Sequence, residues 1–112
     1  MNPGMVLIWY DDDNYARPVI VVSREPLNRG SYVVTVPTTT RRLEIRKAQP
    51  NCVFFRKGEF GFSEDCVAQA ELIAFLPKSN LKSEAVGQVS DERFRDLIRA
   101  IGNVISAQCE PV

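Results

Sequence analysis

The sequence contains no histidine, and this absence excludes several kinds of catalytic site. Histidine is the side chain that titrates near neutral pH, and it is the commonest metal ligand. A histidine-centred nuclease, a Ser-His-Asp triad and a histidine-ligated metal are therefore excluded. Any chemistry has to use carboxylates, Arg, Lys, Tyr, Ser, Thr or Cys, and we expect neither a metal nor another cofactor.

Cysteine is scarce, and the charges of the chain balance. The three cysteines, Cys52, Cys66 and Cys109, are far apart and form no Cys-x-x-Cys pair. We therefore expect free thiols in a reducing compartment rather than a disulfide framework or a zinc site. The chain has 14 basic and 14 acidic residues, so its net charge is zero. A polyanionic partner must then be met by a local patch of the surface.

Long apolar runs are also missing. No stretch approaches the roughly 18 apolar residues of a membrane-spanning helix. The apolar run at 5–10 is too short for the central region of a signal peptide, and no basic residue precedes it. These observations predict a cytoplasmic protein that does not enter a membrane.

The first half of the chain contains apolar runs that are typical of buried strands. Continuous apolar runs rich in β-branched residues predict strands at 5–10, 18–22 and 31–36. Pro37 is expected to end the third strand, because proline has no N–H to donate to a ladder. The segment 38–50 is polar and basic. Weaker patterns predict further strands at 52–55 and 66–70, a continuation of the latter over 72–76, and a short strand at 85–89.

The C-terminal part predicts a helix over about residues 90–107. Ser90 is a good N-cap, and Asp91 and Glu92 follow it, where negative charge complements the helix dipole. Apolar residues then recur at the helical period and form one stripe, which suits either a lid on a sheet or a dimer surface. We expect the tail 108–112 to be flexible.

The order of these elements indicates the fold class. The length fits one domain that spans residues 1–112. Many short strands followed by one helix predict a mainly β (α+β) fold, in which a small curled sheet or barrel has a helix laid against it.

Polar residues that could carry chemistry lie at the ends of the predicted strands, where a rigid scaffold can hold a site. Arg17 and Pro18 precede one apolar strand, and the run from Pro37 to Thr40 follows another. Taken singly, each of these features is an ordinary surface element. The other polar features are the acidic residues Glu64, Asp65 and Glu71 and the basic residues Arg41, Arg42, Arg46 and Lys47.

Taken together and in this order, these segments resemble the MazF/PemK family of toxin ribonucleases. The most specific matches are the Arg-Pro-aliphatic-Ser run at 17–23 and the Pro-x-Thr at 37–39. The resemblance runs from about Gly4 to Ile105. It implies a CcdB/PemK-type fold, which is an SH3-like barrel with helices, and usually a homodimer. Looser matches are Gly-Glu-Phe-Gly-Phe-Ser-Glu-Asp-Cys-Val-Ala at 58–68, Phe-Leu-Pro-Lys-Ser-Asn-Leu at 75–81, Val-Gly-Gln-Val-Ser at 86–90 and the closing helix.

The resemblance also implies an activity: metal-independent, sequence-selective cleavage of single-stranded RNA by an mRNA interferase. The family's conserved Arg before the Pro falls on Arg17, and its Thr two residues after the Pro falls on Thr39. Attack of the 2′-OH on the phosphate creates a crowded, doubly negative state. A fixed guanidinium can grip two of its oxygens in a bidentate fork, and a threonine hydroxyl can donate to a third. Glu71 lies near a position where many relatives carry an acid, so it is the candidate proton acceptor.

Partners follow from the same resemblance. RNA is expected to bind Arg41, Arg42, Arg46 and Lys47, with Tyr15 or Trp9 stacking on a base, although core packing suits Trp9 better. A cognate, MazE-like antitoxin is expected to neutralise the toxin with an acidic, partly disordered tail that folds over the basic segment.

The sequence departs from the family in two places. The loop at 11–16 is shorter than in relatives, where it often ends in Glu-Gln. Relatives also often have Asp-Gln and a basic residue near Glu71, Leu72 and Ala74, of which only the acid is present. A second hypothesis therefore stays open. The chain could be a non-catalytic module on the same fold that acts on a protein target, as CcdB toxins do, or that binds only its antitoxin.

Overall fold

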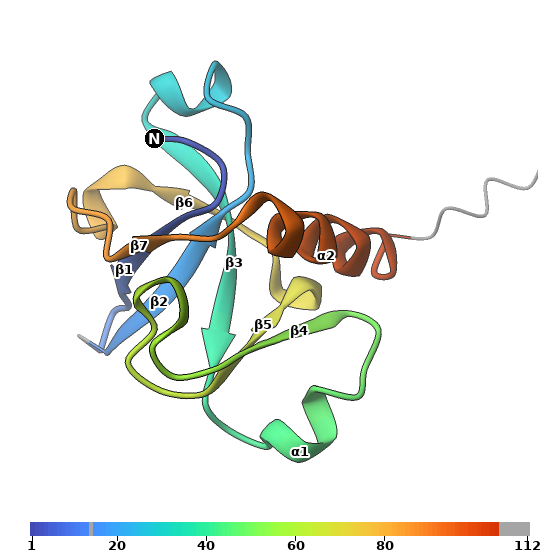
Figure 1. Cartoon of the computed structure of the whole chain (residues 1–112). Helices are drawn as coiled ribbons and strands as arrows, with labels where there is room; N and C mark the ends of the chain where they lie inside the picture. Colours follow the sequence, from blue (N-terminus) through green and yellow to red (C-terminus); the bar gives the residue numbers. More distant parts are fainter. Residues whose placement is uncertain (14, 106–112) are drawn as a thin grey trace, which may run out of the picture.

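β1 (Met5–Tyr10) and β2 (Ala16–Val21) form an antiparallel hairpin at the start of the fold. The turn between them is tight, because a carboxylate oxygen of Asp11 accepts hydrogen bonds from the amides of Asp13 and Tyr15 at 3.0 and 2.9 Å. β2 begins two residues earlier than predicted, so Arg17 lies within the strand, opposite Trp9 of β1. The structure, a computed structural model, describes residues 1–13 and 15–105 (Figure 1).

Seven strands of the described chain form one antiparallel sheet that curls into a half-barrel (Figure 1). Their order is β4-β5-β3-β2-β1-β7, and β6 pairs with β3 beside this path. The prediction of a small barrel of short strands with a C-terminal helix is confirmed. The strands after β2 are β3 (Tyr32–Thr39), β4 (Cys52–Phe55), β5 (Cys66–Gln69), β6 (Ala74–Pro77) and β7 (Gly87–Gln88).

β3 continues through Pro37 to Thr39, so the prediction that Pro37 ends this strand is wrong. The strand changes its partner at this point. Residues up to Thr35 pair with β6, whereas Thr38 and Thr39 pair with β5. The missing N–H of Pro37 costs little here, because it falls in the gap between the two partner strands.

The predicted strand at 52–55 is confirmed, and the later predictions need correction. β5 ends at Gln69, where the 3₁₀ turn η3 (Ala70–Leu72) redirects the chain into β6, which pairs with β3 and does not continue β5. Of the strand predicted at 85–89, only the two residues of β7 form a strand. The segment 38–50 contains a short helix, α1 (Leu43–Arg46). The other 3₁₀ turns are η1 (Leu27–Arg29), η2 (Glu59–Gly61) and η4 (Lys78–Asn80).

Helix α2 (Asp91–Gly102) lies against the sheet. The predicted N-cap is confirmed, because Ser90 Oγ accepts a hydrogen bond from the amide of Arg93 at 3.2 Å. The helix ends at Gly102 and so is shorter than predicted, while residues 106–112, including the tail predicted to be flexible, lie outside the described residues. Leu97 and Ala100 are buried against the sheet, as a lid requires.

The core consists of two apolar clusters, one on each face of the sheet. Val6, Ile20 and Val36 belong to the cluster under α2, whereas Leu7 and Val19 belong to the other. Neighbouring residues of a strand divide between the clusters because their side chains alternate between faces. Half-buried Trp9 packs against the second cluster, and its indole nitrogen is buried without a hydrogen-bond partner. Within the described residues, no helix is long and apolar enough to cross a membrane.

Candidate active site

Arg17 and Thr39 lie on the neighbouring strands β2 and β3, just beyond the last pair of their register. The register of β2 and β3 pairs Val19 with Pro37, so continuing it by two residues places Arg17 opposite Thr39. Both side chains then point to the same face, because alternate residues of a strand share a face. This extension of the register places the two predicted residues near each other, and their roles in the reaction remain a prediction.

The guanidinium of Arg17 is free to meet an anion. The side chain is exposed, and among the described residues it makes no hydrogen bond or ion pair. The backbone of Arg17 is itself restricted to extended conformations, because Arg17 precedes a proline. A fixed backbone below an unpaired guanidinium suits a group that has to grip phosphate oxygens.

Thr39 has a hydroxyl that is already oriented. Its Oγ1 accepts a hydrogen bond from the amide of Arg41 at 3.2 Å. A hydroxyl that accepts from a backbone N–H keeps its own proton for donation. Thr39 can therefore donate to an oxygen bound between it and Arg17.

The predicted basic residues divide into free and paired side chains. Arg46 Nη1 donates to the carbonyl of Arg41 at 2.9 Å and so holds the loop after β3. Lys47 pairs with Glu44 at 3.0 Å and lies over the ring of Phe54. In the part of the chain that the structure describes, the side chains of Arg41 and Arg42 form neither a hydrogen bond nor an ion pair, and both are exposed.

Tyr15 lies on the approach to this site. Its ring is 69% exposed, and its carbonyl accepts from the amide of Asp11 at 3.2 Å, which extends the pairing of β1 and β2. The side chain falls two residues before Arg17 and so shares its face. An exposed ring at this place is available for stacking.

Glu71 is not brought to Arg17 or Thr39. Thr39 pairs with Val67, and Glu71 follows four residues later in η3, about 10 Å along the chain direction of β5. Its carboxylate accepts from Asn51 Nδ2 at 2.9 Å and from Gln69 Nε2 at 3.3 Å. Asn51 adjoins β4, so the carboxylate faces the side of β5 that is away from β3.

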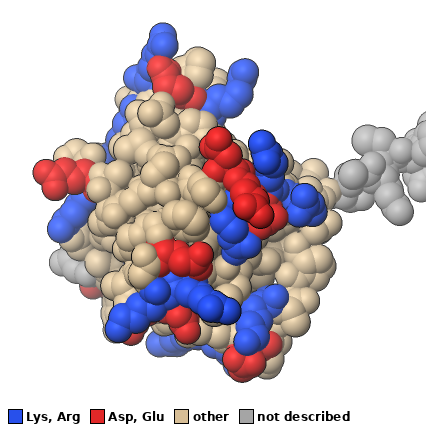
Figure 2. All heavy atoms as spheres, viewed as in Figure 1, with Lys and Arg blue, Asp and Glu red and all other residues tan. Residues whose placement is uncertain are grey.

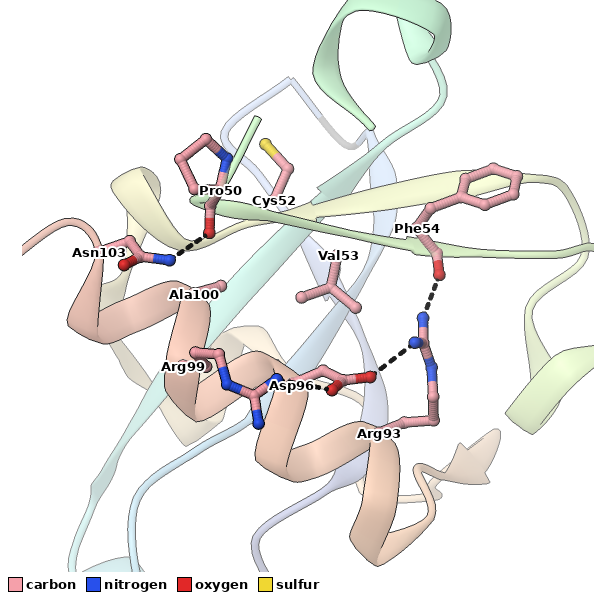
Figure 3. A pocket seen from close by; sticks show the side chains of 9 residues that line it. All are labelled: Pro50, Cys52, Val53, Phe54, Arg93, Asp96, Arg99, Ala100 and Asn103. Carbon is pink, nitrogen blue, oxygen red and sulfur yellow. Dashed lines mark hydrogen bonds and ion pairs between the residues drawn. The ribbon is translucent and has the colours of Figure 1, made fainter. Parts of the chain in front are cut away.

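A groove lies between β4 and α2 (Figure 3), and neither Arg17 nor Thr39 is among the residues that line it. Its charged groups are already paired. Arg93 bonds Asp96 at 2.7 Å and the carbonyl of Phe54, while Arg99 bonds the same carboxylate at 3.2 Å. The carbonyl of Pro50 at the other end accepts from Asn103 Nδ2 at 2.8 Å. These bonds cover the outer edge of β4. The residues lining the groove are Pro50, Cys52, Val53, Phe54, Arg93, Asp96, Arg99, Ala100 and Asn103.

The two described cysteines, Cys52 and Cys66, are free thiols. Burial, followed by the negative charges of Asp65 and Glu59, raises the pKa of Cys66 to about 12. Burial and the nearby Glu71 also raise the pKa of Cys52. A raised pKa keeps a thiol protonated and weakly nucleophilic, so both side chains behave as structural groups.

The surface charge is mixed rather than one-sided. Figure 2 shows Lys and Arg next to Asp and Glu over the face that carries α2, together with a broad area without charged side chains. This distribution agrees with the net charge of zero. Attraction of a polyanion therefore depends on local cations such as Arg17, Arg41 and Arg42.

Comparison with known proteins identifies the family. The family model of the PemK-like, MazF-like toxins of type II toxin-antitoxin systems matches residues 5–105. The chain belongs to this family. No curated protein sequence matches the chain.

Solved structures show the same MazF fold. One is an endoribonuclease in complex with its cognate antitoxin from a mycobacterial species, with 24% identity, 93% of each chain covered and a TM-score of 0.77. The Mycobacterium tuberculosis toxin MazF-mt6 is 23% identical over 89% of this chain and 94% of its own, with a TM-score of 0.75. MazF in the MazE–MazF complex from Deinococcus radiodurans is 18% identical over 95% of each chain, with a TM-score of 0.75.

Proposed function

We propose that this toxin is a metal-independent, sequence-selective endoribonuclease that cleaves single-stranded RNA in the cytoplasm. The observation that carries the proposal is the unpaired guanidinium of Arg17 opposite the oriented hydroxyl of Thr39. The similarity to a mycobacterial endoribonuclease supports it.

The proposed reaction is attack of a ribose 2′-OH on the adjacent phosphate. The 2′-oxygen loses its proton to a base and forms a bond to phosphorus as the bond to the 5′-oxygen breaks. The leaving 5′-oxygen takes up a proton from water, so the products end in a 2′,3′-cyclic phosphate and a 5′-hydroxyl. Arg17 grips two of the phosphate oxygens as charge develops on them, and Thr39 donates to another. Donors fixed in advance are most effective where charge develops, because they need no reorganisation during the reaction.

The RNA strand is held beside this pair. Arg41 and Arg42 are proposed to contact phosphates, since their side chains are exposed, and Tyr15 to stack on a base. Arg46 and Lys47 were predicted for the same role. Both already have protein partners, so each must exchange a bond before it contacts RNA.

Glu71 is the proposed proton acceptor for the 2′-OH. In the present arrangement its carboxylate is held by Asn51 and Gln69, so this role requires those bonds to yield when RNA binds. Glu71→Gln tests the role through the pH dependence of kcat. Loss of the acidic limb of the profile supports Glu71, and an unchanged profile assigns the proton to another group.

Two protein partners belong to the proposal. One is a cognate, MazE-like antitoxin, supported by the complexes of similar MazF toxins. The other is a second copy of the chain. Apolar side chains stay exposed on and beside the edge strand β6, where Tyr32 and Phe75 stack with ring centroids 4.4 Å apart. Light scattering of the purified protein, with Phe75→Ser as a comparison, measures whether a dimer forms through this surface.

The direct test of the activity is incubation of the purified protein with a long single-stranded RNA in EDTA, followed by mapping of the ends. Cuts at one short motif that survive chelation and leave cyclic phosphates support the proposal. Intact RNA together with tight binding to a protein partner supports the alternative of a non-catalytic binding module.

A further inference from the structure

The pairing of β2 with β3 stops just before the two proposed catalytic residues. Its last register pair is Val19 with Pro37. The next pair would be Pro18 with Thr38, and one of its two ladder bonds cannot form because the backbone nitrogen of Pro18 carries no hydrogen. Arg17 and Thr39 therefore lie beyond the last regular pair, at the point where two neighbouring strands are free to separate.

Thr38 supplies an extra bond at this point. Its Oγ1 donates to the carbonyl of Pro18 at 2.8 Å, and its side chain is only 3% exposed. A buried hydroxyl has no water to replace a lost partner, so this bond is retained in the folded state. The carbonyl belongs to the residue that directly follows Arg17, and the ring of Pro18 fixes the backbone torsion between them.

Thr38 and Thr39 consequently have different tasks. Side chains alternate along a strand, so Thr38 points into the core under α2 while Thr39 points to the face of Arg17. Its neighbours confirm the buried position, since Thr38 pairs with Ala68 of β5, which is itself part of that core.

We infer that Thr38 is a positioning residue: its hydroxyl ties the Pro18 peptide to β3 and so holds Arg17 at the distance from Thr39 that gripping one phosphate requires. The expected effect on RNA cleavage rests on the proposed function. The expected effect on the position of Arg17 relative to Thr39 does not. Thr38 itself does not touch RNA, because it is buried.

Thr35 provides a matched control on the same strand. It is also a buried threonine, and its Oγ1 donates to a backbone carbonyl, that of Ala74, at 3.2 Å. That bond ties β3 to β6 and not to β2. Thr35→Val and Thr38→Val thus each remove one buried bond from β3, and only Thr38→Val releases the Arg17 segment.

The experiment compares kcat and KM for RNA cleavage in the wild type, Thr38→Val, Thr38→Ser and Thr35→Val, with thermal unfolding measured alongside. We expect Thr38→Val to lower kcat by about 10- to 100-fold with KM within about twofold, because misplacement of a catalytic group by about 1 Å can cost about 100-fold. Thr38→Ser, which keeps the hydroxyl, should restore kcat. Equal losses of kcat in Thr38→Val and Thr35→Val, or no loss in either, would overturn the inference.

A second readout does not depend on activity. Residues opposite each other outside the hydrogen-bonded pairs have Cα atoms about 4.5 Å apart, so Arg17 and Thr39 should show a strong Hα–Hα nuclear Overhauser effect. We expect it in the wild type, Thr38→Ser and Thr35→Val, and a weakened one in Thr38→Val. If the wild type cleaves no RNA but this pattern holds, the proposed function fails and the positioning role stands. An undiminished effect in Thr38→Val overturns the positioning role itself.

Discussion

Arginines occur in two contrasting settings in this protein: at the start of β2 and in the groove between β4 and α2. Arg17 is exposed and, within the described residues, has no partner, whereas Arg93 bonds Asp96 and the Phe54 carbonyl and lies 4.9 Å from the centroid of the Phe55 ring. The groove is concave, yet its cations Arg93 and Arg99 are already bonded to groups of the protein.

Because of this difference, the proposed anion site follows from the pairing of the arginines and not from the concavity of the surface. A guanidinium that bridges a carboxylate and a carbonyl stabilises the fold and covers the edge of β4 (Figure 3). A guanidinium held on a proline-restricted backbone without a partner has its donors available for a phosphate. The proposed catalytic site therefore lies at the start of β2, and we expect the groove to contribute to stability.

The largest expected effect among the side chains around Arg17 is that of Thr39→Val. Loss of one fixed donor to the transition state should lower kcat by about 100-fold or more. Thr40→Val is the control, because Thr40 is adjacent and exposed and removal of its hydroxyl should change kcat by less than about twofold. Steady-state cleavage of a short RNA containing the target motif measures kcat for both variants. Equal effects on kcat would contradict a catalytic role for Thr39.

In the groove, Arg93→Ala should lower the free energy of unfolding by about 1–2 kcal/mol, because it removes charge-assisted hydrogen bonds from a partly buried position. Cleavage per folded molecule should stay within about twofold. Arg99→Ala is the control. Its side chain is 72% exposed and pairs with the same Asp96, so its loss should cost about 0.5 kcal/mol or less. Urea unfolding measures the stabilities, and a catalytic defect confined to Arg93→Ala would contradict the assignment.

Free and paired cations should also differ in RNA binding. Arg41→Gln and Arg42→Gln should each weaken binding several-fold and reduce the slope of log K against log salt by about 0.7, the value for one phosphate contact in single strands. Lys47→Gln should have less effect, because Lys47 already pairs with Glu44. Fluorescence anisotropy with a non-cleavable 2′-deoxy analogue over a range of salt measures the slopes. A larger change of the slope in Lys47→Gln than in the two arginine variants would contradict the proposal that the unpaired cations contact RNA.

A separate, pH-dependent effect concerns Cys66 in the core under α2. Its pKa is raised to about 12, chiefly by burial, so the folded protein keeps the thiol protonated when the unfolded chain has lost the proton. The contribution is fully present below pH 9 and is lost as pH rises from 9 toward 12, at no more than about 1.4 kcal/mol per pH unit. The stability difference between the wild type and Cys66→Ala should therefore shrink between pH 9 and 11. A difference that is independent of pH would contradict this.

The sequence predicted the strands whose apolar pattern is continuous, and it failed where the tertiary context decides. The run at 5–10 became β1 because it is buried on both sides, and Ser90 capped α2 through a purely local bond. Pro37 did not end β3, because the strand exchanges β6 for β5 at that residue, which no local pattern reveals.

The same limit applies to the site. Arg17 and Thr39 could be named from their motifs, and the register of β2 and β3 places them together. No motif indicates a role for Thr38, since its hydroxyl bonds a carbonyl 20 residues away in the chain. The sequence also did not predict that Arg46 bonds the Arg41 carbonyl and that Lys47 pairs with Glu44, because a run of basic residues does not indicate which side chains form bonds within the protein.

One comparison tests the central assignment most directly: the rate of RNA cleavage in EDTA by Arg17→Ala beside Arg93→Ala and the wild type. The account predicts a loss of at least about 100-fold for Arg17→Ala, with an unfolding temperature close to that of the wild type. It predicts nearly full activity per folded molecule for Arg93→Ala. Retained cleavage in a folded Arg17→Ala protein, at the same motif and with the same ends, would contradict it.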